Sequence, residues 1–285
     1  MLDGVRTKAK DRPSKTVLFG EPGSGKTTTA CSLPQTVMIN TDNGAEEVLA
    51  KNEDLWVFDA IPVEPSNTEK EPHKHNAESF DSIVNFLRKL YTEKHDRKYL
   101  VIDAADAVER LAISSVCHEH KEWILEPVGG GYGKGTSYLR GRMWQLWSAI
   151  TKLSEDKGIT PIIVCHSKIV RIDKPHLEPY DSNSLKLNKN VSADLQEWAD
   201  SVLFLAPFTK VVTRTGDFGK QDMRGVKTDD RVLYTSATMG VECKNRYSLP
   251  SEIRPADLET YFRLVQESRV QSKKPATKET EGCRK

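Results

Sequence analysis

Eight consecutive residues near the start of the chain have the types and spacing of a phosphate-binding loop. The run Gly20-Glu21-Pro22-Gly23-Ser24-Gly25-Lys26-Thr27 follows the pattern G-x-x-x-x-G-K-[S/T]. Its glycines let consecutive backbone N–H groups turn inward around a phosphate, where a Cβ atom would clash. We expect Lys26 to reach the β- and γ-phosphates of a nucleotide, and the Thr27 hydroxyl to ligate Mg²⁺. The predicted nucleotide-binding residues are this run and the adjoining Thr28.

The elements on either side of this run are those that such a loop requires. A short apolar strand beginning at Thr16 precedes it, and a helical stretch follows it to about Leu33, where Pro34 stops the helix. The amino-terminal end of that helix brings the positive end of its dipole to the phosphate site. A glycine-rich turn without a ligand is the alternative, and the strand-loop-helix context disfavours it.

An aspartate at the end of another apolar strand is the expected partner of Mg²⁺. The stretch Tyr99-Leu100-Val101-Ile102-Asp103 is apolar and ends in an acid. Ligands of an open α/β sheet bind at the carboxyl ends of its strands, where the phosphate loop also lies. We therefore assign Asp103 to the magnesium site, largely through water. A strand-end cap or turn is the alternative for Asp103, and the nearby Asp106 is a candidate helix N-cap.

Hydrolysis of a nucleotide also needs a group that activates water. Asp42 lies just past the expected strand at 36–40, where its carboxylate can face the γ-phosphate. Glu46 and Glu47 are the next candidates, although acids are also favoured at the start of a helix. A simple turn role for Asp42 remains open.

The composition fits a globular protein of one large domain or two small ones. The chain has 285 residues and a net charge of +1, so DNA binding would have to come from local basic patches. Its 5 cysteines are scattered without a C-x-x-C pair, as expected of reduced thiols. No apolar run approaches the roughly 18 residues of a membrane span, and the first residues lack a signal sequence. We expect a cytoplasmic protein without a membrane partner.

Short apolar strands alternate with amphipathic helices along the chain. This alternation predicts an α/β fold with a mostly parallel central sheet flanked by helices. Helices are expected over 79–94 and over 137–157, the second capped by Gly158. The polar stretch 214–230 is expected to form an exposed hairpin or flap. The expected strands are 16–20, 36–40, 55–58, 99–103, 161–165 and 202–205.

The order of these pieces resembles the RecA-like P-loop ATPase core, and more closely the short phage-encoded RecA-like nucleotide-binding proteins. Some members of that phage group act as single-strand annealing proteins in recombination. The resemblance covers roughly residues 14–265. It implies ATP and Mg²⁺ as ligands and ATP hydrolysis as the activity. It also implies a RecA-like ATPase domain over 14–267. From their own residues, we expect 1–13 to be a basic flexible arm and 268–285, which lack apolar anchors, to be a disordered tail.

The resemblance also implies roles for four residues. RecA-like cores have an acid after the second strand that activates water; Asp42 occupies that place, although glutamate is commoner there. His166, after the strand at 161–165, takes the place of the γ-phosphate sensor; RecA has Asn-Gln there, and the phage group has a histidine. Lys244 and Arg246 resemble the Lys-Asn-Lys whose cations reach the nucleotide of the adjacent subunit. The alternatives are a histidine that caps a strand at the surface and a solvated basic strand end.

Two stretches correspond to the loops through which RecA-like proteins bind single-stranded DNA. One spans about Lys121 to Arg140 and combines a run of glycines with aromatic and basic residues. The other spans about Lys168 to Asn190. A lid over the nucleotide, or a merely solvated charged loop, is the alternative. The predicted DNA-binding residues are Trp123, Tyr132, Lys134, Arg140, Lys168, Arg171, Lys174, Lys186 and Lys189.

The leading hypothesis is a DNA-dependent ATPase of RecA type that binds single-stranded DNA, self-associates as a ring or filament, and promotes annealing or strand pairing in phage recombination and repair. A single-strand-binding protein is a candidate partner, and the host cytoplasm is the expected location. The alternative is an ATP-binding switch or loader partner in phage replication with weak or no hydrolysis. A small-molecule kinase is disfavoured because no Arg-rich lid segment is evident. A metal site at Cys117-His118-Glu119-His120 is disfavoured because no second ligand pair is evident.

Overall fold

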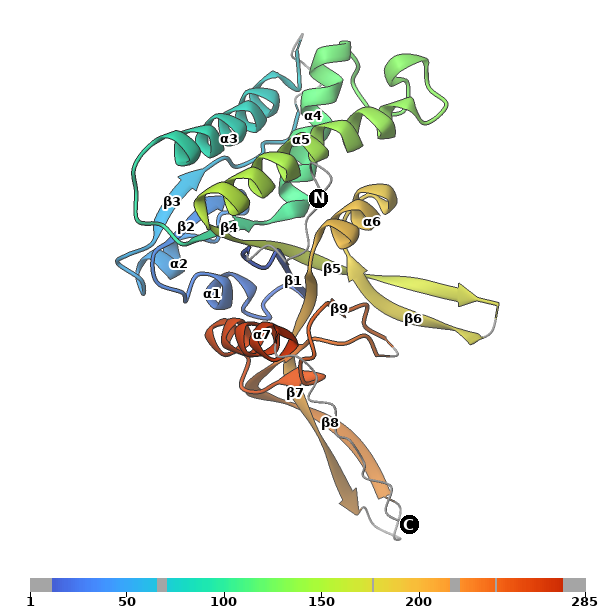
Figure 1. Ribbon diagram of the computed structural model, residues 1–285. Helices are drawn as coiled ribbons and strands as arrows, with labels where there is room; N and C mark the ends of the chain where they lie inside the picture. Colours follow the sequence, from blue (N-terminus) through green and yellow to red (C-terminus); the bar gives the residue numbers. More distant parts are fainter. Residues whose placement is uncertain (1–11, 66–70, 176, 216–220, 239, 274–285) are drawn as a thin grey trace, which may run out of the picture.

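A computed structural model describes residues 12–65, 71–175, 177–215, 221–238 and 240–273. Within these residues the strands join in one sheet whose central part is parallel (Figure 1). The strands are β1 Thr16–Gly20, β2 Thr36–Asn40, β3 Trp56–Asp59, β4 Tyr99–Asp103, β5 Thr160–Lys174, β6 Leu177–Leu185, β7 Ser201–Thr215, β8 Gln221–Tyr234, β9 Lys244–Asn245 and β10 Glu252–Ile253. Their order across the sheet is β10-β8-β7-β1-β5-β4-β2-β3, with β6 on β5 and β9 on β7.

Helices cover both faces of the sheet. None of those in the described part of the chain has the length and apolar character needed to cross a membrane. The helices are α1 Lys26–Ala30, α2 Glu46–Leu49, α3 Lys74–Thr92, α4 Ala105–His120, α5 Lys134–Lys157, α6 Lys189–Trp198 and α7 Leu258–Lys273, with a single 3-10 turn η1 Val128–Gly130.

Strand β1 shows why both faces need a cover. Successive side chains of a strand point to opposite faces, and every residue of β1 is buried. Val17 and Phe19 pack into one apolar cluster with α3, α4, α5 and α6. Leu18 packs into a second cluster with α1, α2 and α7. Parallel strands buried on both faces are typical of α/β proteins, so the predicted fold class is confirmed.

The six predicted strands and the two predicted long helices are all present. The helix expected over 79–94 is α3, and the helix expected over 137–157 is α5. Gly158 ends α5 with a φ of 74°, a conformation that favours glycine. The helix after the phosphate loop is shorter than expected, because it ends at Ala30 rather than near Leu33.

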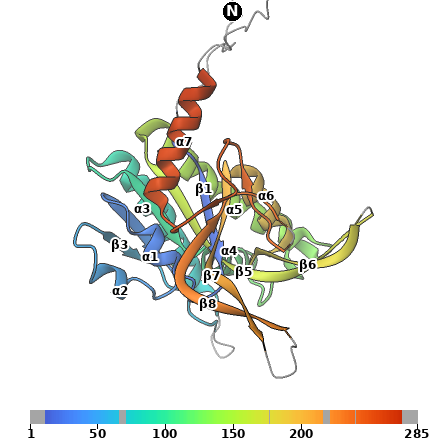
Figure 2. The same cartoon turned by 90° about the horizontal axis from the view of Figure 1, so that it is seen from below.

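Two long hairpins project from the body of the molecule (Figures 1 and 2). The hairpin expected within 214–230 is formed by β7 and β8. The expected DNA-binding loop over 168–190 is wrong as a loop, because β5 continues to Lys174 and pairs with β6. The β-branched residues Ile169, Val170 and Ile172 favour a strand in that segment.

Both termini are more ordered in part than the sequence indicated. The tail predicted from residue 268 is helical up to Lys273, because Leu258, Tyr261 and Val265 anchor α7 in the core. Residues 274–285 lie outside the described residues. In the predicted basic arm, residues 1–11 also lie outside them, whereas the Arg12 guanidinium donates to Asp200 Oδ1 over 2.8 Å.

Candidate active site

The phosphate loop lies between the end of β1 and the start of α1, and its shape depends on glycine. Gly23 and Gly25 have φ angles of 75° and 91°, in the left-handed region that glycine adopts without strain. A Cβ atom on Gly20 would lie 2.4 Å from the carbonyl oxygen of Leu205, so glycine at this position allows the close approach of β7. The backbone conformation of the loop therefore requires glycine at these positions of the motif, as expected of a phosphate-binding nest.

Thr27 and Asp103 come together at the carboxyl edge of the sheet. Thr27 Oγ1 donates a hydrogen bond to Asp103 Oδ2 over 2.5 Å. Burial raises the pKa of Asp103, and the hydrogen bond from Thr27 opposes that rise. Hydroxyl and carboxylate oxygens are hard ligands of the kind that Mg²⁺ prefers, so this pair fits the predicted magnesium site.

Lys26 is folded against its own loop. Its Nζ donates to the carbonyl oxygen of Glu21 over 2.8 Å. Burial lowers the pKa of Lys26, and the carboxylates of Asp103 and Asp106 oppose that change. A phosphate would offer this buried ammonium a stronger, charged acceptor than the carbonyl group.

His166 connects two acids beside the phosphate loop. Its Nδ1 lies 3.1 Å from each carboxylate oxygen of Asp106, and its backbone N–H donates to Asp106 Oδ1 over 3.1 Å. Its Nε2 lies 3.6 Å from Asp42 Oδ2. Burial would raise the pKa of Asp106, but the hydrogen bonds from His166 outweigh it and hold that pKa below its usual value.

Asp106 therefore has a different role from the helix cap that the sequence left open. Ala104 occupies the N-cap position of α4, and Asp106 lies in the first turn with its carboxylate on His166. Sequence reasoning missed this contact, because strand β5 lies directly beside β4 only in the folded sheet.

Most of the predicted nucleotide-site residues line a single pocket of about 430 Å³, although Gly20, Glu21 and Ser24 are not in its lining. The loops that follow β1 and β2, the last residue of β4 and the middle of β5 converge there. Glu46 and Glu47 reach it from the first turn of α2, and Arg231, which the sequence analysis did not single out, reaches it from β8. The lining residues are Pro22, Gly23, Gly25, Lys26, Thr27, Thr28, Asp42, Asn43, Gly44, Glu46, Glu47, Val48, Asp103, His166 and Arg231.

Lys244 and Arg246 do not belong to this pocket. Lys244 pairs with Val202 near the start of β7, whereas the pocket lies at the carboxyl end of the parallel strands. Its Nζ donates to the carbonyl oxygens of Gln196 and Ala199 over 2.6 and 3.0 Å. These residues therefore cannot contact the nucleotide of their own chain, and any role in the site of a neighbouring chain is a proposal.

A groove with basic walls lies between the β5–β6 hairpin and α6. It measures about 730 Å³, and four of the predicted DNA-binding residues line it. Asp173, Glu197 and Glu242 line it too, so its charge is mixed. The four basic residues are Lys168, Arg171, Lys174 and Lys189.

The first predicted DNA-binding stretch, residues 121–140, has exposed side chains and one arginine that is held in an ion pair. Trp123 is 48% exposed, and Tyr132 is exposed over its whole side chain. Lys134 is also exposed, as is Lys186 of the second predicted stretch. Arg140, in contrast, forms a bidentate ion pair with Asp194 of α6, in which Nε and Nη2 donate to the two carboxylate oxygens over 2.7 and 2.8 Å. This pair ties α5 to α6, which also borders the groove.

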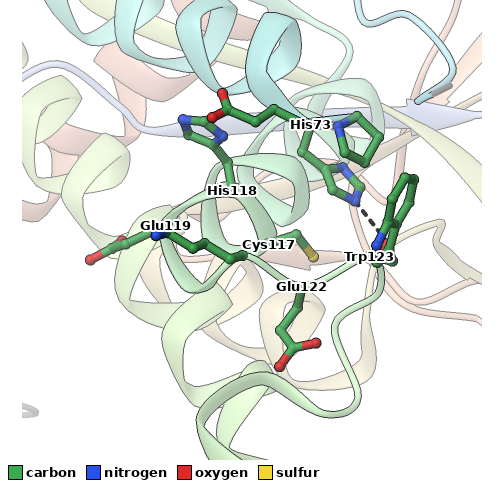
Figure 3. A pocket seen from close by; sticks show the side chains of 9 residues that line it. His73, Cys117, His118, Glu119, Glu122 and Trp123 are labelled. Atoms are coloured by element: carbon green, nitrogen blue, oxygen red, sulfur yellow. Dashed lines mark hydrogen bonds between the residues drawn. The ribbon is translucent and has the colours of Figure 1, made fainter. Parts of the chain in front are cut away.

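The His- and Cys-containing stretch at the end of α4 shows no metal site. Figure 3 shows the side chains of Cys117 and His118 pointing in different directions within a pocket of about 480 Å³. Both ring nitrogens of His73 form hydrogen bonds: Nδ1 lies 3.0 Å from Ser114 Oγ, and Nε2 lies 2.8 Å from the carbonyl oxygen of Trp123. The described residues contain no group of three or more His, Cys, Asp and Glu side chains that could hold a metal ion.

A buried acid joins α4 to α6 near the site. Both carboxylate oxygens of Glu109 accept from the backbone N–H of Asn188, at 2.9 and 3.0 Å, and Asn188 is the N-cap of α6. Burial raises the pKa of Glu109 to about 7, although the N–H of Asn188 opposes the rise. No motif in the sequence pointed to this residue.

One comparison with known protein families gives a match. A family model described as AAA domain matches residues 12–247, which covers the site and most of the sheet. No curated protein matches the chain.

Glu109→Gln is expected to change how stability depends on pH. The folded-state pKa is raised from 4.5 to about 7, so the folded state binds the proton more tightly than the unfolded state. The contribution of Glu109 is therefore present below about pH 4.5 and is lost as the pH rises through about 7. Urea unfolding from pH 5 to pH 8 should show the wild type losing stability relative to Glu109→Gln. A constant difference across that range would contradict the raised pKa.

Arg246→Ala is expected to weaken the fold without weakening ATP binding in dilute solution. Arg246 Nη1 donates over 3.1 Å to the buried carboxylate of Asp200, which keeps Arg12 as a partner. We expect a loss of about 0.5–1.5 kcal/mol in urea unfolding. Arg263→Ala, which removes an exposed pair with Glu267, is the control. A tenfold loss of ATP affinity in the isolated chain would contradict the position of Arg246 away from its own pocket.

Proposed function

We propose that this chain, which belongs to the AAA domain family, is an ATPase of RecA type that binds single-stranded DNA and promotes annealing or strand pairing. The family and the fold identify a P-loop NTPase core. ATP as the nucleotide, DNA as the partner and recombination or repair as the process are the proposed part. The observation that carries the proposal is that one strand, β5, contributes to both the nucleotide pocket and the basic groove.

The nucleotide pocket supports the ATPase part of this proposal. Lys26 and the glycine-rich loop would hold the phosphates, while Thr27 and Asp103 would hold Mg²⁺ largely through water. Bound Mg²⁺ would offset the negative charge that the phosphates carry. Asp42 lines the pocket beside His166 and is the proposed base for water, with Glu46 and Glu47 as the alternatives in the same pocket.

Strand β5 supports a coupling between ATP and DNA. His166 lies in β5 at the pocket, and Lys168, Arg171 and Lys174 follow in the same strand at the groove. His166 has polar contacts with Asp42 and Asp106, so the loss of a phosphate near His166 would alter both contacts. A shift of β5 would then move the walls of the groove.

The groove and its surroundings support a single-stranded partner. Lysine and arginine side chains track a phosphate backbone, while exposed aromatic rings stack on unpaired bases. Trp123 and Tyr132 are exposed rings in the stretch that precedes Arg140. The net charge of +1 favours binding by this local surface over general attraction to nucleic acid.

Self-association is part of the proposal. Lys244 and Arg246 lie at the end of the sheet opposite the pocket. In a ring or filament they would have to leave their contacts with the Gln196 and Ala199 carbonyl oxygens and with Asp200 to reach the nucleotide of a neighbouring chain. Hydrolysis would then depend on assembly. A single-strand-binding protein is a further proposed partner, and a phage-infected host cytoplasm is the proposed setting.

A second candidate function is an ATP-binding switch or loader partner in phage replication with little hydrolysis. The contact between Asp42 and His166 favours it, since the carboxylate proposed to activate water is already close to an imidazole at 3.6 Å. The two functions differ in turnover and share the nucleotide pocket.

ATP hydrolysis by the full chain should rise when long single-stranded DNA is added, and the stimulation should fade as salt increases. Each lost phosphate contact lowers the slope of log affinity against log salt by about 0.7 for single strands. Arg171→Ala/Lys174→Ala should therefore show weaker stimulation and a shallower slope. Arg88→Ala/Lys89→Ala, on the exposed face of α3, is the matched control and should behave as the wild type.

Lys26→Ala should abolish turnover with and without DNA, because it removes the phosphate-binding ammonium. Tight ATP binding by the wild type without turnover under any of these conditions would favour the switch instead. Equal effects of the two double variants would remove the groove from the proposal.

A further inference from the structure

We propose that Arg231 of β8 is a phosphate-binding residue that completes the nucleotide pocket of its own chain. This inference rests on the proposed function, because it names a further residue of the same site. The ligand class is a nucleoside di- or triphosphate held by the phosphate loop. The inference rests on the position of the exposed Arg231 guanidinium against Gly25. Arg231 comes from β8, which lies two strands away from β1 in the sheet.

The register of the sheet explains why Arg231 lies over the phosphate loop. Phe19 of β1 pairs with Phe204 of β7, which pairs with Tyr234 of β8. Arg231 is three residues away from Tyr234 and pairs with Pro207, beyond the carboxyl end of β1. The antiparallel strand β8 thus passes the point at which β1 gives way to the phosphate loop.

The guanidinium of Arg231 touches the part of the loop that a phosphate would use. A Cβ atom built on Gly25 would lie 2.7 Å from both Cζ and Nε of Arg231, so the planar group lies against the glycine backbone. Arg231 lines the same pocket as Lys26 and His166. It is exposed, and no ion pair or side-chain hydrogen bond of Arg231 occurs within the described part of the chain.

The charge balance of the pocket favours a second cationic side chain near the phosphates. Asp42, Asp103, Glu46 and Glu47 all line it, and Lys26 is the other lysine or arginine there. A di- or triphosphate carries several negative charges, which one ammonium and one Mg²⁺ would offset only in part. A guanidinium matches phosphate oxygens through paired N–H donors, and this geometry favours arginine for such contacts.

The backbone of Arg231 is fixed while its side chain remains available. Its carbonyl oxygen accepts from the N–H of Ala256 over 2.9 Å. The preceding residue, Asp230, pairs with Arg254 over 2.9 Å, and the Arg254 guanidinium stacks on the ring of Phe208 with its Cζ 3.4 Å from the centroid. These contacts brace the root of the β7–β8 hairpin next to the pocket. A phosphate held by Arg231 would therefore tie this hairpin to the nucleotide state.

The test measures binding of ATP and of ADP, each with Mg²⁺, to the full chain by calorimetry. Arg231→Ala should weaken ATP binding by about 10- to 100-fold, as expected for loss of a charge-assisted contact. Arg231→Lys should be intermediate, because lysine keeps the charge without the paired donors. Arg263→Ala removes an exposed arginine of α7 and should bind as the wild type. Arg231→Ala binding within twofold of the wild type would overturn the inference.

Two further results separate this inference from the proposed function and test the same-chain contact. If the wild type binds ATP and Lys26→Ala does not, the nucleotide site stands whatever Arg231 does; no ATP binding by the wild type would overturn both. A contact within one chain predicts that the wild-type affinity is unchanged on dilution of the protein. A fall to the Arg231→Ala affinity on dilution would place the contact between chains and overturn the assignment.

Discussion

The hydrogen bond between Thr27 Oγ1 and Asp103 Oδ2 is the contact on which the rest of the site depends. It joins the phosphate loop after β1 to the end of β4, although β5 lies between those two strands in the sheet. The bond can form only if the carboxyl ends of all three strands meet at one edge. That condition brings His166 into the gap and places Asp42, after the neighbouring β2, on its far side. One parallel register therefore positions the whole pocket.

The same register also connects the pocket to two distant surfaces by continuous strands. Strand β5 continues beyond His166 into the hairpin whose basic residues line the groove. Strand β8 brings Arg231 to the opposite side of the phosphate loop and continues into the second hairpin. Both hairpins thus begin at residues that face the nucleotide pocket.

The sequence predicted the elements whose signals are local. The phosphate loop, the apolar strands and the core face of α5 follow from spacing and periodicity alone, and the structure has them nearly where they were expected. Long-range contacts were not predictable in this way. The bond between Asp106 and His166 joins residues 60 positions apart, and Arg231 reaches Gly25 only through the pairing of β7 with β8. Hairpin β5–β6 was mistaken for a loop because its many charged residues outweighed the β-branched Ile169, Val170 and Ile172 in the prediction.

The most direct test of a nucleotide site built on Thr27 and Asp103 is amide hydrogen exchange of the full chain with and without ATP and Mg²⁺. Residues 23–28 and 103–106 should exchange more slowly with both ligands present, because the phosphates would cover the loop and Mg²⁺ would tighten its link to β4. Asp103→Asn should lose the magnesium-dependent part of that protection. Unchanged exchange in both segments, or protection confined to the groove beside α6, would contradict the account.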